Sequence, residues 1–292
     1  MIFINPKIDY AFKKIFGSDE SKDILISFLN ALIYEGNSTI EDLEIINPNL
    51  PPIVQGLKDT YLDVKAKLND GTLVIIEMQV LNVQSFGKRV LFNAAKTYAF
   101  QLQKGEGYRM LKPVLALTLT DFEMFPNRDH FASRFVFREA SDGSMYTDNN
   151  LELVFVELPK FTKELEQLET ITDKWIYFMK SARSLSSIPE NMDDIPEINQ
   201  AFEIANQANL TPAEREDLDR REMFIYDQQG AVAFGREEGR QQGIEEGREE
   251  GMVEGKREEK LAIARKLLPI LDDEAIAQTT GLSIAEVREL RD

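Results

Sequence analysis

Apolar and polar residues alternate on both sides of one turn, within residues 61–80. The flanks read YLDVKAKL and TLVIIEMQV, and the NDG between them is a strong turn signal. We expect a β-hairpin closed by a three-residue loop, Asn69–Gly71, with a positive φ angle at Gly71. Because opposed residues of a hairpin share one face of the sheet, this loop length places Asp63 beside Glu77.

The alternation gives the hairpin two unlike faces. One face is apolar in both strands and consists of Val64, Ala66, Leu68, Val74, Ile76, Met78 and Val80. The other face mixes apolar residues with Asp63, Lys65, Glu77 and Gln79. Two adjacent carboxylates repel each other unless a cation or a proton lies between them. A hard divalent cation suits such a pair, and the alternative is an ordinary charged face turned towards solvent.

The same kind of pattern predicts the other elements of the chain. Helical spacing of apolar residues predicts helices at 7–16, 21–33, 84–104, 161–182, 197–208 and 211–228. Short apolar runs predict strands at 43–46, 112–120, 131–137 and 151–158. Turn residues predict loops at 47–55 and 140–150 and a polar linker at 184–196. In the helix at 161–182, Trp175 belongs to an apolar stripe, which favours core packing over a base-stacking role.

The C-terminal region carries a glycine repeat, with glycine at 235, 239, 243, 247, 251 and 255. Each glycine costs a helix about 1 kcal/mol relative to alanine, whereas each ion pair three or four residues apart contributes about 0.2–0.5 kcal/mol. We therefore expect a marginal, highly charged helix, a flexible or self-associating stalk. Residues 272–287 then resemble part of a helix-turn-helix, whose acidic second helix favours a protein partner over DNA.

Composition excludes several kinds of site. The chain has no cysteine and one histidine, His130, which excludes disulfides, thiolate zinc sites and cysteine nucleophiles and nearly excludes a Ser-His-Asp hydrolase. The N-terminus lacks a basic region followed by an apolar run, and no apolar stretch approaches about 18 residues. We expect a soluble, cytoplasmic protein without a membrane segment.

The net charge of −17 is unevenly spread along the chain. Residues 1–130 hold 14 Lys and Arg against 16 Asp and Glu, whereas residues 131–292 hold 20 against 35. The half with the hairpin is thus close to neutral, and local basic patches there remain able to contact phosphates. The acidic half argues against tight non-specific DNA binding by the whole chain.

The order of these elements resembles the PD-(D/E)XK nuclease superfamily, and more narrowly the recombination-promoting nuclease (transposase) family. The motifs that carry the resemblance are DYAFKKIF (Asp9–Phe16), YLDV, IEMQ, a helix with Arg89 and Tyr98, GEGYRMLKPV and the glycine-periodic tail. They extend over nearly the whole chain. Two residues depart from the usual motif, because Leu62 replaces the proline of the superfamily name and Gln79 stands where many members have lysine.

The resemblance implies an α/β fold of the restriction-endonuclease-like type, a mixed β-sheet flanked by helices and followed by an all-α C-terminal extension. We expect four parts. These are a nuclease-like domain at 1–183, a helical linker region at 184–229, a glycine-periodic charged helix at 230–268 and a small helix-turn-helix-like tail at 269–292.

The resemblance also implies a DNA endonuclease that depends on Mg²⁺ or Mn²⁺ and promotes recombination or acts on mobile or foreign DNA. Asp63 and Glu77 would hold the metal, Gln79 would orient a water and Lys65 would supply positive charge. Asp9 and Arg89 are possible accessory residues. The alternative for Asp9 is an ordinary surface pair with Lys13, four residues further along the same predicted helix. The C-terminal tail would bind a second copy or a protein partner. The alternatives are an inactive nuclease-like interaction module and a three-carboxylate transposase.

Overall fold

The computed structural model describes residues 1–50, 60–146 and 150–291. Most of the loop predicted at 47–55, and part of the loop predicted at 140–150, lie outside these residues. Contacts within the chain divide it into two compact units, Met1–Tyr226 and Asp227–Asp292. Every candidate site residue belongs to the first unit.

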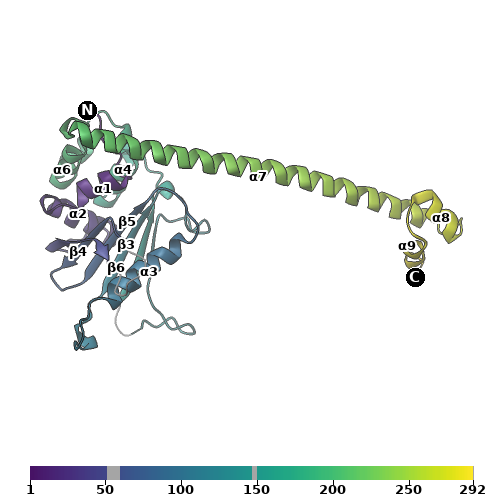
Figure 1. The fold of residues 1–292 in the computed structure, drawn as a ribbon, viewed down its shortest axis with the longest axis horizontal. Coiled ribbons are helices and arrows are strands. Elements are labelled where there is room, and N and C mark those ends of the chain that lie inside the picture. The colour runs from purple at the N-terminus through teal and green to yellow at the C-terminus, as the bar shows by residue number, and fades with distance from the viewer. Residues whose placement is uncertain (51–59, 147–149, 292) are drawn as a thin grey trace. The chain divides into compact units, whose positions relative to one another are not determined.

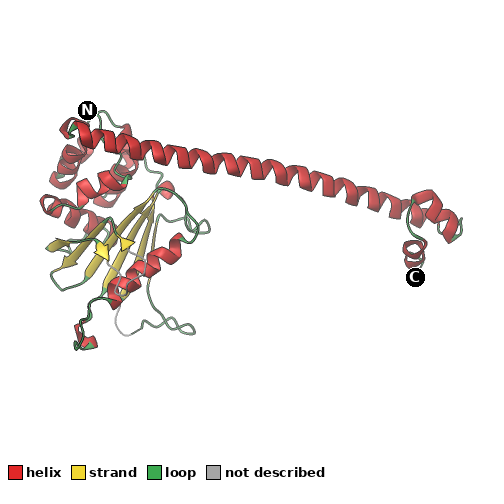
Figure 2. Ribbon diagram, in the orientation of Figure 1, coloured by secondary structure: helices red, strands yellow, loops and turns green. Residues whose placement is uncertain are grey.

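The first unit is built on a mixed six-stranded sheet (Figure 2). In spatial order its strands are β1 (Leu43–Ile46), β4 (Val64–Leu68), β5 (Leu73–Gln79), β6 (Val114–Thr120), β8 (Leu151–Glu157) and β7 (Ala132–Phe135). The pairs β5–β6 and β6–β8 are parallel, and the other pairs are antiparallel. A separate two-stranded sheet pairs β2 (Asn49–Leu50) with β3 (Thr60–Tyr61). The predicted mixed α/β architecture is confirmed.

Helices cover both faces of the large sheet (Figure 1). Helix α3 (Phe86–Ala99) lies on one face, and α1 (Asp9–Phe16), α2 (Lys22–Ile33), α4 (Ile171–Ser181) and α6 (Pro196–Ala205) lie on the other. The chain also contains α5 (Glu190–Asp193) and the long α7 (Pro212–Leu267), whose residues belong partly to the first unit and partly to the second. On one face, Ile75 and Ala116 of the sheet pack with Ala94 of α3. On the other face, alternate strand residues such as Ile76 share a larger core with α1, α2, α4 and α6. The sheet is thus the middle of three layers.

The larger core is centred on aromatic residues from several helices. Trp175 is fully buried, and its ring contacts those of Phe16, Phe28 and Phe178. Phe178 in turn contacts Phe202 of α6, at 4.8 Å between ring centroids. The prediction that Trp175 packs in the core is confirmed, and the predicted linker region contributes a buried ring to that core.

The N-terminal residues are anchored by a segment about two hundred positions away in the chain. The amide of Ile4 donates to the carbonyl of Ala205, and the amide of Gln207 donates to the carbonyl of Ile2, both at 2.8 Å. Phe3 and Ile4 are fully buried. The two ends of the first unit therefore complete one core.

Helices α4 and α3 are about ten and seven residues shorter than predicted, respectively, and hydrogen bonds at their ends explain the differences. Helix α4 begins at Ile171, not at 161, because Thr170 and Asp173 form a reciprocal capping box at its first turn. Helix α3 ends at Ala99, not at 104. Beyond it, the Gln101 side chain exchanges two hydrogen bonds with the backbone of Lys112, which favours a turn towards β6.

The hairpin register is as predicted. Lys65 pairs with Ile75 and Val64 with Ile76, so the extrapolated partner of Asp63 is Glu77. The turn closes where the amide of Leu68 donates to the carbonyl of Thr72, at 2.9 Å. Within the loop, Gly71 has a φ of +89°, a conformation that costs glycine little.

The second unit contains the glycine repeat and the tail. The repeat is helical throughout, as part of α7, and its side chains are exposed. Helices α8 (Asp273–Thr280) and α9 (Ile284–Glu289) are separated by Gly281, whose φ is +68°. Ala264, Ile276, Leu282 and Val287 form their small core. Across the described parts of both units, no helix combines the length and the apolar character that crossing a membrane requires.

Candidate active site

The two hairpin carboxylates lie on the same side of the sheet, at the carboxyl end of β5. Asp63 immediately precedes β4, and its Oδ2 accepts a hydrogen bond of 2.8 Å from the amide of Met78. Glu77 is a residue of β5 and is only 9% exposed. The charge of Asp63 is close enough to raise the pKa of Glu77. The predicted pairing of these two acids is therefore present in the fold.

Burial disfavours the ionised form of both acids. It raises the pKa of Asp63, although the Met78 amide and the Lys13 ammonium act in the opposite direction. It also raises the pKa of Glu77, against the lowering effects of Asn93 and Arg89. Two carboxylates in this environment are stabilised by an added cation.

Helix α1 brings both a cation and a third carboxylate to the pair. Lys13 and Asp9 do not form the predicted pair with each other. Lys13 Nζ lies 3.3 Å from Asp63 Oδ1, while both Asp9 oxygens accept hydrogen bonds from Arg221 of α7, at 2.8 and 2.6 Å. The prediction failed because both side chains have partners from other elements. Asp9 still approaches the pair, since its charge raises the pKa of Asp63.

Arg89 holds the side chain of Gln79. Its Nη2 donates to Gln79 Oε1 at 2.5 Å, and its Nε lies 3.8 Å from Glu77 Oε2. The amide nitrogen of Gln79 donates to the carbonyl of Leu81 at 2.7 Å. The guanidinium also lies over the ring of Phe86, 4.9 Å from its centroid. Arg89 therefore places a positive charge beside both Gln79 and Glu77.

Asn93 is a site residue that the sequence reasoning missed. Its Nδ2 donates to Glu77 Oε1, and its own Oδ1 is buried with no hydrogen-bond partner among the described residues. Asn93 follows Arg89 by four positions on α3, so the two side chains share one helix face. A polar residue four positions beyond Arg89 in an otherwise apolar stripe was the available signal.

Lys65 lies on β4, as predicted, but among the described residues it forms no ion pair with Asp63 or Glu77. It pairs with Ile46 of β1 and Ile75 of β5, and burial lowers the pKa of its ammonium group. Its side chain has no hydrogen bond or ion pair within the part of the chain that the structure describes. Arg89 therefore has the more direct contact with the acidic pair.

The donor set fits a hard divalent cation. Asp63 and Glu77 supply carboxylate oxygens, and the unpartnered Asn93 Oδ1 lies beside Glu77. Mg²⁺ is commonly bound by one or two carboxylates and completes its shell with water and substrate phosphate. Among the residues described, no three His, Cys, Asp or Glu side chains gather at one point. The site is thus a two-carboxylate arrangement without a third acidic ligand in place.

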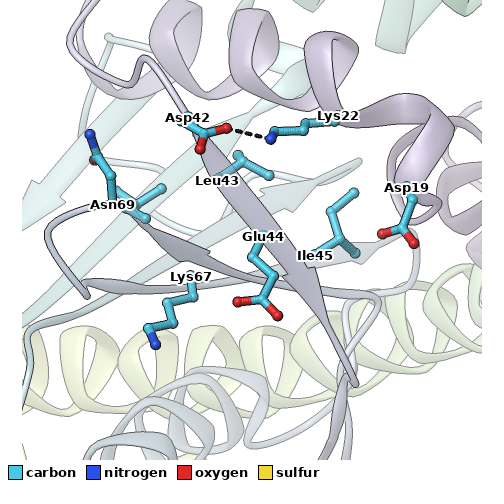
Figure 3. Close-up of a pocket in the computed structure, with 9 residues that line it drawn as sticks. Asp19, Lys22, Asp42, Leu43, Glu44, Ile45, Lys67 and Asn69 are labelled. Carbon is cyan, nitrogen blue, oxygen red and sulfur yellow. Dashed lines mark ion pairs between the residues drawn. The ribbon is translucent and has the colours of Figure 1, made fainter.

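A second charged hollow lies beside the edge strand β1 (Figure 3). Its charges compensate one another. Lys22 forms an ion pair with Asp42, and Lys67 is the register partner of Glu44. The carboxylates there are exposed, without the burial that raises the pKa of Asp63 and Glu77. This edge therefore lacks the features that mark the hairpin site.

A comparison with family models agrees with the fold. The model described as PD-(D/E)XK nuclease family transposase matches residues 6–235, which include the whole sheet and every candidate site residue. No curated protein and no solved structure matches the chain. By fold, motif order and extent of the match, the chain belongs to the PD-(D/E)XK nuclease family of transposases.

Proposed function

We propose that this protein is a DNA endonuclease that hydrolyses phosphodiester bonds with the help of Mg²⁺ or Mn²⁺. The observation that carries the proposal is the buried Asp63–Glu77 pair at the carboxyl end of β5, in a member of a nuclease family. Nucleases of the PD-(D/E)XK type generally use divalent metals, and membership implies a DNA substrate. The pair is the part of the site that suits such a metal.

Asp63 and Glu77 would hold the metal, and the backbone carbonyl of Met78 is a further ligand by analogy. When bound, a divalent ion lowers the pKa of a coordinated water and polarises the phosphate. Gln79 orients a water through its amide group, which is not basic at neutral pH. Arg89 stabilises the negative charge of the phosphate, because a guanidinium binds phosphate oxygens with two donors.

Membership in a nuclease family of transposases supports a proposal for the biological role. We propose that DNA breakage by this protein promotes recombination or acts on mobile or foreign DNA, in the cytoplasm. The acidic C-terminal unit is an unsuitable DNA reader, since Glu286 and Glu289 lie on α9. We assign it to contacts with a second copy of the chain or with a protein partner.

The test is a cleavage assay on supercoiled plasmid with the full chain. We expect nicking with Mg²⁺ or Mn²⁺, none with EDTA, and none with the Asp63→Ala variant at any metal concentration. Nicking that persists in EDTA would contradict the metal requirement, and nicking by folded Asp63→Ala would remove Asp63 from the site.

One observation favours a second function. The lysine of many superfamily members is replaced by Gln79, whose carbonyl oxygen is already occupied by Arg89. A family member with a weakened site is able to serve as an interaction module through its acidic tail. Absence of cleavage on any DNA with any divalent metal, in a folded protein, would favour this function.

Arg89 and Lys65 are alternative sources of the positive charge, and their contacts predict different results. Arg89→Ala should lower single-turnover nicking by about ten- to a hundredfold, as loss of a residue supporting a metal site typically does. Lys65→Ala should change it by less than about threefold, because Lys65 contacts neither acid. Single-turnover rates at saturating metal separate the two.

An exchange variant controls for simple loss of packing. Gln79→Lys combined with Arg89→Gln restores a cation next to Glu77 and should cut faster than Arg89→Gln alone. Equal rates for the exchange variant and Arg89→Gln, together with a slow Lys65→Ala, would assign the charge to Lys65.

A further inference from the structure

A hollow of about 530 Å³ adjoins the candidate active site. One side is the end of β5 and the residues after it, including Gln79 and Leu81. The other side is the beginning of α7, including Arg220, Arg221 and Phe224. Because Gln79 lines the hollow and accepts a hydrogen bond from Arg89, which forms an ion pair with Glu77, these side chains connect the hollow to the acidic pair.

The α7 side of the hollow is fixed to the rest of the unit. Arg221 binds Asp9 through both carboxylate oxygens, and Leu218 is fully buried in the core. One turn earlier, Glu214 accepts hydrogen bonds from Lys14 and Tyr10, at 2.6 and 2.7 Å. These contacts hold this part of α7 in a fixed position within the first unit, where it forms one wall of the hollow.

Two side chains on this wall, those of Phe224 and Arg220, contribute little to the stability of the fold. Phe224 lines the hollow yet is 61% exposed, which is unusual for a large aromatic side chain. Arg220 has a side chain 69% exposed, and its contact is a 3.6 Å ion pair with Asp217. An exposed pair of this length contributes little to stability. Both side chains are available to a ligand.

The chemistry of the hollow is that of a nucleotide site. An aromatic ring that protrudes from a partly apolar wall provides a surface on which a base stacks, and each such stack contributes about 1–3 kcal/mol. A guanidinium one helical turn away provides the contact for a phosphate. Asp9 and Lys7, which also line the hollow, are already paired with Arg221 and Asp121, so Arg220 is the cation most readily released.

We propose that this hollow binds one deoxynucleotide of the substrate strand beside the scissile phosphate, with its base stacked on Phe224 and its phosphate held by Arg220. This assignment rests on the proposed nuclease function and adds a subsite to it. It makes the first turns of α7 part of the DNA-binding surface.

The test measures DNA binding separately from cleavage. The full chain in EDTA is titrated against a fluorescein-labelled oligonucleotide at several salt concentrations, and anisotropy gives Kd. Phe224→Ala should raise Kd about tenfold, and Phe224→Tyr should restore it. Arg220→Ala should weaken binding and reduce the slope of log K against log salt by about 0.7–0.9, the loss of one phosphate contact.

Two variants serve as matched controls, since neither residue lines the hollow. Tyr226 is an exposed aromatic two residues beyond Phe224 on the same helix, and Arg109 is an exposed arginine outside the site. Tyr226→Ala and Arg109→Ala should leave Kd unchanged within about twofold, and thermal melts confirm that all variants are folded.

The outcomes distinguish failure of the proposed nucleotide subsite from failure of the proposed nuclease function. If the wild-type chain binds and cuts DNA while Phe224→Ala and Arg220→Ala behave like the two controls, the subsite is wrong and the nuclease proposal stands. If the wild-type chain neither binds nor cuts any DNA, both proposals fail together.

Discussion

Replacing Glu77 by glutamine is expected to lower the nicking rate by more than about a hundredfold while the protein stays folded. The glutamine side chain keeps the shape of glutamate and an oxygen that accepts the hydrogen bond from Asn93. It loses the negative charge, and a neutral amide is a much weaker ligand for a hard divalent ion. Residues that merely support metal ligands already cost about 10–100-fold when removed, so a ligand should cost more.

Single-turnover nicking of supercoiled plasmid at saturating Mg²⁺ measures this effect. Glu44→Gln is the matched control, because it removes one exposed carboxylate from edge strand β1, away from the pair. The control should cut at the wild-type rate. Wild-type cleavage by folded Glu77→Gln would show that the carboxylate pair is not the metal site.

The second large expected effect is on thermal stability. It arises because metal ions and protons would bind the same two carboxyl groups, those of Asp63 and Glu77. In the absence of metal, the double variant Asp63→Asn/Glu77→Gln is expected to melt at a higher temperature than wild type at pH 7.5. Burial raises the pKa of both carboxyl groups, so their ionised forms lower the stability of the folded state. The amides retain the shape of the acids without the charge.

The pH dependence of this difference has a definite sign. A carboxyl group whose pKa is raised in the folded state contributes stability below its unfolded pKa, near 4, and loses that contribution as pH rises through the folded value. The advantage of the double variant should therefore shrink as the pH of the melt is lowered towards 4. If the difference in melting temperature between the double variant and wild type grows at lower pH, groups other than Asp63 and Glu77 determine that difference.

Divalent metal should reverse the order of the melting temperatures, so that wild type melts above the double variant. Metal that binds only the folded state stabilises it by about 2.7 kcal/mol at a hundred times its Kd, or about 5–10 °C in Tm for a unit of this size. Wild type and Glu44→Gln should show this increase with Mg²⁺ or Mn²⁺, and the double variant should not. Equal increases in all three proteins would place the metal elsewhere.

The features that could be predicted from the sequence are those that local residue patterns determine. The NDG turn and the two-residue alternation define the hairpin register, because a slip by one residue would bury the charged face. The pairing of Asp63 with Glu77 could therefore be derived from the residues of the hairpin alone. The order of strands and helices followed from the spacing of apolar residues, and the family resemblance added the fold type.

What the sequence did not predict depends on contacts between distant segments. Arg221 lies 212 positions from Asp9, and no local pattern indicates that it would replace Lys13 as the partner of that acid. Asn93 interrupts the apolar stripe of its helix four positions beyond Arg89, but the partner of its side chain, Glu77, lies on a different element. The early end of α3 depends on Gln101 binding the backbone of Lys112, which is again a tertiary contact.

The anchoring of the N-terminus to the segment after α6 has a consequence for synthesis. Ile4 cannot form its hydrogen bond until Ala205 has left the ribosome, about 10–40 s after the first residues at ordinary rates of translation. Arg221, which holds Asp9 beside the acidic pair, emerges later still. On the nascent chain the proposed active site therefore lacks its contact from α7 for most of translation, and the first unit completes its core and this contact only after Arg221 has emerged.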